Sequence, residues 1–183
     1  SSRLWKLLGM ALSKKETISI AGKSYDKKAC YLAAVNGSKT STSWYNLACA
    51  MSLDESVVVR KTAFTRLQCL MEAIRCDAKD DGAWNNIAAS LDKGETITIP
   101  GFKGAIGKRE CYTHALEASN GGNKLAWKNL ALTMESEEAA TTGKTTTVTK
   151  TKKKKTVDTV TIAGKSYSKK EAAAMAQAKK VAA

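Results

Sequence analysis

Residues 84–94, Trp-Asn-Asn-Ile-Ala-Ala-Ser-Leu-Asp-Lys-Gly, decide the fold, because the same pattern returns in altered form at three other places. The returning stretches begin at the other tryptophans, Trp5, Trp44 and Trp127. Successive tryptophans lie 39, 40 and 43 positions apart. A fixed period of roughly 20 to 50 residues is typical of repeat proteins, in which each unit covers a hydrophobic face of its neighbour. We therefore predict a repeat protein.

Each of the first three repeats contains a second recurring motif, a cysteine followed four positions later by alanine, and the cysteine lies 25 to 27 residues after the tryptophan. Apolar residues at spacings of three and four predict helices over residues 3–13 and 26–36 of the first unit. Asn36 and Gly37 are expected to end the second helix, because both residues tolerate the left-handed conformation. Thr17-Ile-Ser-Ile20 alternates polar and apolar residues, which predicts a short extended, hairpin-like insert between the helices.

The chain divides into three parts by composition. Residues 1–134 hold about three and a half repeats. Residues 135–158 are dominated by Thr and Lys and predict a flexible insertion, because low hydrophobicity and like charges disfavour a packed core. Residues 159–183 resume the fourth repeat, since residues 159–170 nearly duplicate residues 17–28. An Ala-rich helix over residues 169–181 is then expected to close the chain.

The repeats resemble a known family, the tetratricopeptide repeats. Trp5-x2-Leu8-Gly9-x2-Leu12 is similar to the signature of that family's first helix, and Ala73 to Trp84 is similar to its linker between units. Two departures are Ala78, where the family usually has Pro, and the insert, which lengthens the period beyond the usual ~34 residues. The resemblance implies an all-α class, a right-handed α-solenoid of helix pairs with short hairpin-like inserts.

The resemblance also implies a binding groove. In tetratricopeptide proteins the first helices line the concave groove, and the residue two positions after the tryptophan points into it. That position holds Asn46, Asn86 and Asn129 here, and Leu7 in the first unit. An Asn amide both donates and accepts, so such a row could hold the backbone of an extended peptide. The alternative is that these asparagines only belong to the repeat consensus. Four further residues would share this face: Lys6, Tyr45, Asn85 and Lys128.

Positive charge is concentrated near the C-terminus. The formal net charge is +13, and residues 140–183 carry 11 Lys and Arg against 2 Asp and Glu. This predicts an electrostatic arm that meets an acidic protein surface or RNA, with a solvated linker as the alternative. No aromatic residue lies within residues 135–158, so base stacking is not supported there. The lysines of this arm are Lys150, Lys152, Lys153, Lys154 and Lys155.

Several classes of site lack support in the sequence. Cys30, Cys69 and Cys111 occupy one equivalent position, which indicates small buried hydrophobic residues rather than a disulfide framework. The chain has one histidine and no CxxC pair, so we expect no metal, no cofactor and no catalytic group. Apolar runs are shorter than the ~20 residues that span a bilayer, so no membrane partner is expected. Reduced cysteines favour an intracellular, cytoplasmic location, with an organelle as the alternative.

These observations favour a non-enzymatic scaffold that binds protein partners within a larger assembly. One alternative is an RNA-associated helical-repeat subunit of a ribonucleoprotein particle, whose arm contacts phosphates. Another is a lattice or filament subunit whose repeats associate end to end. The chain does not begin with Met and starts near a repeat boundary, which is compatible with a longer parent array.

Overall fold

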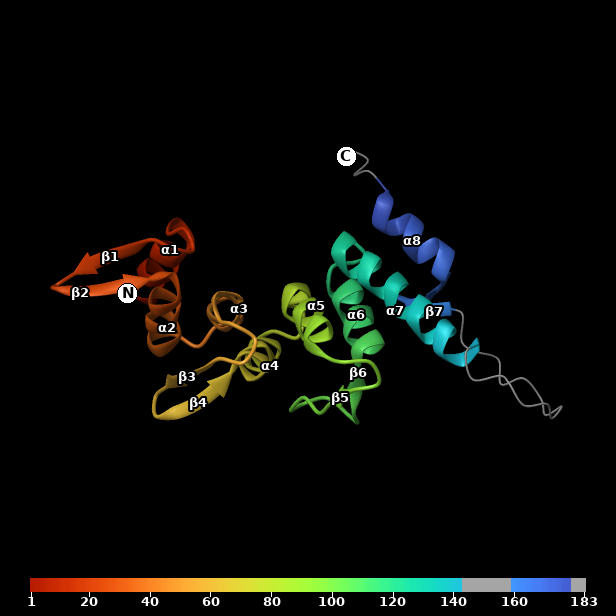
Figure 1. Ribbon diagram of the computed structural model, residues 1–183, viewed down its shortest axis with the longest axis horizontal. Coiled ribbons are helices and arrows are strands. Elements are labelled where there is room, and N and C mark those ends of the chain that lie inside the picture. The colour runs from red at the N-terminus through yellow and green to blue at the C-terminus, as the bar shows by residue number, and fades with distance from the viewer. Residues whose placement is uncertain (143–158, 179–183) are drawn as a thin grey trace.

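A computed structural model describes residues 1–142 and 159–178 of the chain (Figure 1). These residues are mostly helical and form eight helices and four small antiparallel strand pairs. The strands mean that the chain is not purely all-α. The helices are α1 (Ser2–Ala11), α2 (Lys27–Gly37), α3 (Ser41–Ala50), α4 (Arg66–Cys76), α5 (Asp81–Ser90), α6 (Lys108–Ala118), α7 (Lys124–Thr142) and α8 (Lys169–Gln177). The strands are β1 (Thr17–Ile20), β2 (Lys23–Asp26), β3 (Ser56–Val59), β4 (Thr62–Thr65), β5 (Thr96–Ile97), β6 (Ile106–Gly107), β7 (Thr159–Ile162) and β8 (Lys165–Ser168).

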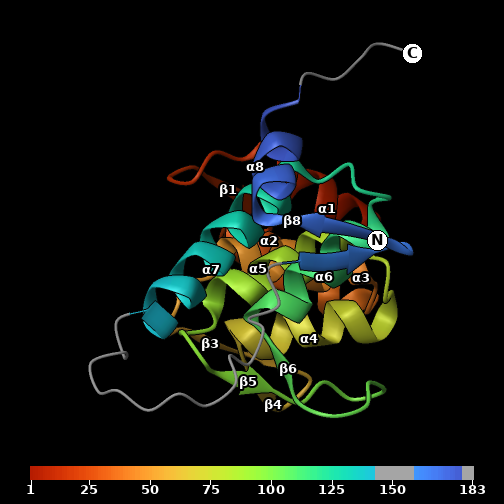
Figure 2. The same cartoon turned by 90° about the vertical axis from the view of Figure 1, so that its right-hand side faces the viewer.

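The predicted order of helix, hairpin and helix is confirmed in four successive units, α1–α2, α3–α4, α5–α6 and α7–α8. The two helices of each unit pack on each other, and the second packs on the first helix of the next unit. In Figure 1 the pairs therefore follow one another along the long axis of the molecule. The view along this axis shows helices from different units overlapping near the centre (Figure 2).

The predicted end of the second helix is wrong in one respect. Gly37 is the last residue of α2, and Ser38 after it has an extended conformation with φ −154°. Neither Asn36 nor Gly37 is left-handed. Glycine suits this position because a Cβ on Gly37 would lie only 3.0 Å from the Cβ of Ser2, so the glycine lets α1 approach α2.

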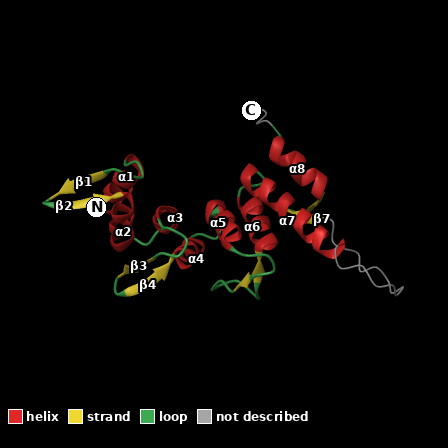
Figure 3. Ribbon diagram, viewed as in Figure 1, coloured by secondary structure: helices red, strands yellow, loops and turns green. Residues whose placement is uncertain are grey.

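Tight two-residue turns close three of the hairpins. The strands of the first two, β1–β2 and β3–β4, are yellow in Figure 3. Ala21 and Gly22 both have positive φ, 49° and 75°, which suits the right-handed twist of paired strands. The second hairpin forms the same turn without glycine, with φ of 46° at Arg60 and 73° at Lys61. In the third unit only two residues pair on each strand, and a longer loop joins β5 to β6.

An aromatic pair attaches each hairpin to its own helices. The tryptophan of the first helix contacts an aromatic ring of the hairpin, with ring centroids 4.7 to 5.0 Å apart. In the third unit Ile106 stands where the others have an aromatic residue, and Phe102 of the loop supplies the ring instead. Such pairs add stabilisation beyond the burial of their area. The four pairs are Trp5 with Tyr25, Trp44 with Phe64, Trp84 with Phe102, and Trp127 with Tyr167.

The buried core runs through the units rather than forming separate clusters, because side chains of all four units belong to one contiguous set. Cys30, Cys69 and Cys111 are fully buried, which confirms their prediction as small hydrophobic core residues. All five cysteines are free. The core is continuous across the unit boundaries, although the helices contact each other more extensively within a unit than between units.

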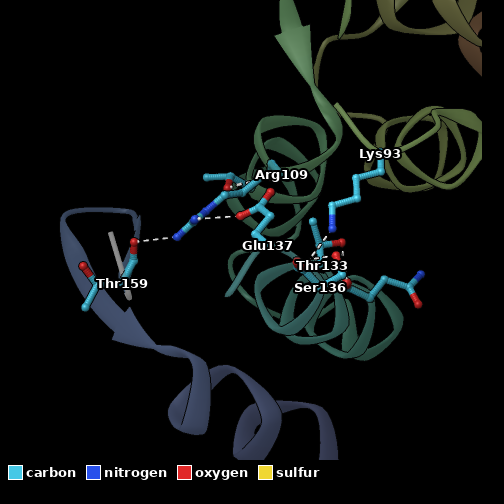
Figure 4. Close-up of polar contacts among 8 residues, drawn as sticks. Lys93, Arg109, Thr133, Ser136, Glu137 and Thr159 are labelled. Carbon is cyan, nitrogen blue, oxygen red and sulfur yellow. Dashed lines mark hydrogen bonds and ion pairs between the residues drawn. The ribbon is translucent and has the colours of Figure 1, made fainter. Parts of the chain in front are cut away.

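Helix α7 is longer than predicted, because it continues through Thr142 and includes residues assigned to the flexible insertion. Contacts with the third unit hold its second half: Lys93 Nζ donates to the Ser136 carbonyl at 2.6 Å. Arg109 contacts Glu137 at 3.2 Å and donates to the Thr159 carbonyl at 2.8 Å (Figure 4). The predicted arm lysines lie at positions 150 and 152–155, outside the described residues.

Candidate functional site

The predicted groove asparagines lie on three successive first helices. Asn46 belongs to α3, Asn86 to α5 and Asn129 to α7, and each is partly exposed. Leu7 occupies the same position of α1 and is 47% exposed. Their hydrogen bonds differ, however. Asn86 donates to Cys49 Sγ at 3.6 Å and Asn129 donates to Asn85 Oδ1 at 3.5 Å.

Four further residues were predicted to share the face of the asparagine row, and two of them, Tyr45 and Asn85, are used in packing. A Cβ on Gly82 would lie 3.0 Å from Tyr45 Cζ, so the Tyr45 ring fills the space that this glycine leaves on α5. Burial raises the pKa of Tyr45 to about 12. Asn85 is only 5% exposed and accepts from Asn129, so it is not available to a ligand. Lys6 is partly exposed and Lys128 is exposed, and both remain accessible.

Two cavities lie at equivalent junctions between units, and the sequence did not predict them. The first, of about 400 Å³, lies between α2 and α3, and the second, of about 290 Å³, lies between α6 and α7. Four equivalent pairs of side chains line them: Lys14 and Lys93, Lys27 and Lys108, Tyr31 and Tyr112, and Asn46 and Asn129. The recurrence of Tyr with Asn at fixed repeat positions is the signal that could have indicated them.

The carboxylates beside the first cavity already have partners. Asp26 caps α2 by accepting from the Ala29 amide at 2.7 Å. Glu55 pairs with Lys28 and accepts from the Ser52 amide at 3.0 Å. The hydrogen bond from Lys28 is the main reason that the pKa of Glu55 is lowered. The negative charges at this cavity are therefore compensated within the protein.

Two lysines beside the first cavity, Lys14 and Lys27, have no acidic partner among the described residues. Lys27 Nζ donates to the Leu12 carbonyl at the end of α1, at 2.8 Å, and its positive charge has no counter-ion among the described residues. Lys14 has neither a hydrogen bond nor an ion pair within the described part of the chain. The rim of this cavity consequently carries uncompensated positive charge.

More of the polar side chains that line the second cavity form hydrogen bonds within the protein than at the first cavity. Tyr112 is 3% exposed, and burial raises its pKa, opposed by a hydrogen bond from Asn129. Lys93 donates to the Ser136 carbonyl at 2.6 Å. Lys108 has no such partner among residues 1–142 and 159–178.

The junction between α4 and α5 differs from both. Arg66 stands at the position of Lys27 and reaches across, donating to the Ala48 carbonyl at 3.2 Å and to Ser90 Oγ at 3.0 Å. Leu70 replaces the tyrosine and is fully buried. This junction therefore offers no tyrosine hydroxyl, and its cation is already engaged by the protein.

Neither a metal-ligand cluster nor a membrane-spanning helix is found among the described residues. No group of three or more His, Cys, Asp or Glu side chains is placed to hold a metal ion there. His114 instead packs on the Trp84 ring, with centroids 4.6 Å apart. None of the described helices combines the length and apolar composition needed to cross a bilayer.

Comparisons of the chain with protein-family models, with curated protein sequences and with solved structures each found no match. Its function is therefore inferred from the geometry described above.

Proposed function

We propose that the protein is a non-enzymatic scaffold that binds an extended segment of a partner protein across its first helices. In this proposal the four units form an α-solenoid of tetratricopeptide-like helix pairs. The supporting observation is the recurrence of one polar cavity at two junctions, each lined by an asparagine from the row on the first helices. A site that repeats along an elongated molecule suits a ligand that is itself extended.

The chemistry of the row supports a peptide rather than a small molecule. An Asn side chain offers one acceptor and two N–H donors, which match the alternating groups of an extended backbone. The candidate positions are distributed over three units, whereas small-molecule sites are usually one enclosed pocket. Repeat proteins commonly use such extended surfaces for binding.

Replacing Asn46, Asn86 and Asn129 together by Ala is expected to weaken partner binding while leaving the fold nearly intact. Truncating partly exposed Asn46 and Asn86 should change stability by within about 0.5 kcal/mol each. Truncating Asn129 also removes the donor of buried Asn85 and should cost about 1 to 3 kcal/mol. The partner is identified by affinity purification with mass spectrometry, and its binding to the purified parent and triple variant is measured by calorimetry. Thermal melts of both proteins report the fold.

Asn36→Ala is the matched control, because Asn36 is exposed on α2 and donates only to the Leu32 carbonyl of its own helix. It should leave partner affinity unchanged. Unfolding of the triple variant would show that the asparagines are structural. Equal affinity of parent and triple variant would place the binding site on another face.

A second candidate function, end-to-end self-association, is favoured by α1. Its exposed apolar residues include Leu4 at 60% and Met10 at 58%. The position of Leu4 is buried by the preceding unit elsewhere, where Ser43 is 4% exposed and Ala83 is fully buried. We expect Leu4→Glu to abolish concentration-dependent association in sedimentation velocity. A parent protein that stays monomeric at all concentrations would exclude this function for the chain.

A further inference from the structure

We propose that the cavity between α2 and α3 binds the carboxylate of an acidic side chain, and that the related cavity between α6 and α7 binds a second one. The protein would thus select acidic extended segments. This inference rests on the proposed function, because it assigns a chemical class to the segment that the scaffold binds. Four observations carry it: unpaired polar groups, uncompensated charge, cavity size and the absence of an exposed aromatic face.

The first cavity contains polar groups that no described residue satisfies. Tyr31 is only 5% exposed and lines the cavity, yet its hydroxyl makes no hydrogen bond with the described residues. The Asn46 amide lines the same cavity and likewise makes none. Neither group is closed off from solvent, because Trp44 Nε1 is the one buried side-chain nitrogen or oxygen without a partner in the described part of the chain. Both groups are therefore open to an occupant of the cavity. A carboxylate can accept from both the hydroxyl and the amide N–H.

The charge of the rim selects an anion. Lys14 has no partner within the described residues, and Lys27 contacts only neutral groups, the Leu12 carbonyl and the Tyr31 ring, whose centroid is 6.0 Å from its Nζ. Asp26 and Glu55 are occupied by a helix cap and by Lys28. An incoming carboxylate would therefore meet unpaired ammonium groups rather than unpaired carboxylates. Hydrogen bonds with an ionised partner are roughly twice as strong as neutral ones.

The size and lining of the cavity fit an amino-acid side chain. Its volume of about 400 Å³ lies near the lower end of typical ligand pockets, which are roughly 300 to 1,000 Å³. Ala50 and Met51 supply apolar contacts for the methylene groups of a Glu or Asp side chain. The cavity accordingly has room for an acidic side chain together with part of the backbone that carries it.

The same cavity is poorly suited to RNA. Unspecific single-strand binding relies on bases that stack on aromatic faces. The Tyr31 ring is instead packed against α1, where a Cβ on Gly9 would lie 2.6 Å from its Cε1 atom. Because the ring face is covered, Tyr31 has only its hydroxyl edge to offer a ligand. A phosphate could use the lysines, but it would gain no stacking.

Two anionic positions follow from the recurrence of the cavity. Tyr112 and the unpartnered Lys108 repeat the hydroxyl and the free cation of the first cavity two units away, although Asn129, unlike Asn46, already bonds to Asn85 and Tyr112. The junction between them has Leu70 and the engaged Arg66, so it lacks both the hydroxyl and the free cation. We therefore expect the bound segment to carry two acidic positions separated by a stretch of any charge.

The test measures fluorescence anisotropy of labelled peptides with the full chain. The probes are a peptide of alternating Glu and Ala, and the same peptide with Gln in place of every Glu. The Glu peptide should bind at least about tenfold more tightly, because only its carboxylates can form charge-assisted hydrogen bonds with the lysines. Tyr31→Phe, which keeps the ring, and Lys14→Gln should each weaken the Glu peptide by about tenfold.

Matched controls are Tyr25→Phe and Lys23→Gln, which make the same chemical changes on the first hairpin, away from the cavity. They should leave the affinity unchanged. Equal binding of Glu and Gln peptides, or no effect of Tyr31→Phe, would overturn the carboxylate site. If both peptides nevertheless lose affinity in the triple asparagine variant, the proposed groove stands while this inference fails. Tighter binding of an oligouridylate than of the Glu peptide would replace the acidic protein segment with RNA.

Discussion

Trp84→Ala is expected to lower the free energy of unfolding by roughly 3 to 5 kcal/mol, the usual cost of truncating a buried aromatic side chain. Trp84 is 1% exposed in the middle of the chain. It joins three parts of the structure. Its ring contacts Phe102 of the third hairpin and His114 of α6, with centroids 5.0 and 4.6 Å away. Its indole N–H donates to the Ala78 carbonyl in the linker from the second unit, at 2.9 Å.

The loss combines a cavity with a broken link between units. Removing the indole leaves the Ala78 carbonyl without its donor and leaves Phe102 without the ring that attaches it. Because the core is continuous, the third unit also supports the packing of its neighbours. Urea unfolding followed by circular dichroism measures the change, and the midpoint should fall with it.

Trp5→Ala is the matched control. Trp5 holds the equivalent position of the first unit but is only partly buried, and it contacts Tyr25 alone among aromatic rings. It should cost clearly less than Trp84→Ala. Melting of Trp84→Ala within a degree or two of the parent would contradict the role of Trp84 as the link between units.

Raising the pH above about 9 is expected to destabilise the protein through its buried thiols. Burial raises the pKa of both Cys69 and Cys111 from 9.0 to about 12. In the unfolded chain these thiols ionise near their ordinary pKa, so between pH 9 and 12 the unfolded state binds fewer protons than the folded state. Stability is therefore complete below pH 9 and is lost as the pH rises towards 12.

The expected size follows from linkage. One thiol that is protonated in the folded state and ionised in the unfolded state contributes up to ~1.4 kcal/mol per pH unit, and two contribute about twice as much. Chemical unfolding at a series of alkaline pH values measures this slope. Tyr45, whose pKa is also about 12, titrates in the same range and is therefore left unchanged in the control.

The control is the Cys69→Ala/Cys111→Ala double variant. It should be less stable than the parent at neutral pH, because it removes buried sulfur, but its stability should fall less steeply above pH 9. Parallel slopes for the two proteins would show that these thiols do not govern alkaline unfolding. Ready modification of either thiol by a maleimide in the folded protein would contradict their burial.

The sequence by itself determined the repeat architecture. The spacing of the four tryptophans and of the equivalent cysteines reports the repeat period, and the alternation in Thr17-Ile-Ser-Ile20 reports the local period of a strand. The order of helix, hairpin and helix and the burial of Cys30, Cys69 and Cys111 were therefore predictable. The peptide-binding role of the asparagine row is still a prediction.

Only the tertiary structure decided how equivalent positions differ. Asn85 and Tyr45 share a repeat position with Lys6 and Lys128, yet the first two are used in packing because of what the neighbouring helix presents to them. The cavities at Tyr31 and Tyr112 arise between units, and Leu70 with Arg66 closes the corresponding place at the middle junction. Residues 135–142 extend α7 because Lys93 and Arg109 of the preceding unit hold it. Such outcomes depend on contacts between residues distant in sequence, which a local pattern does not encode.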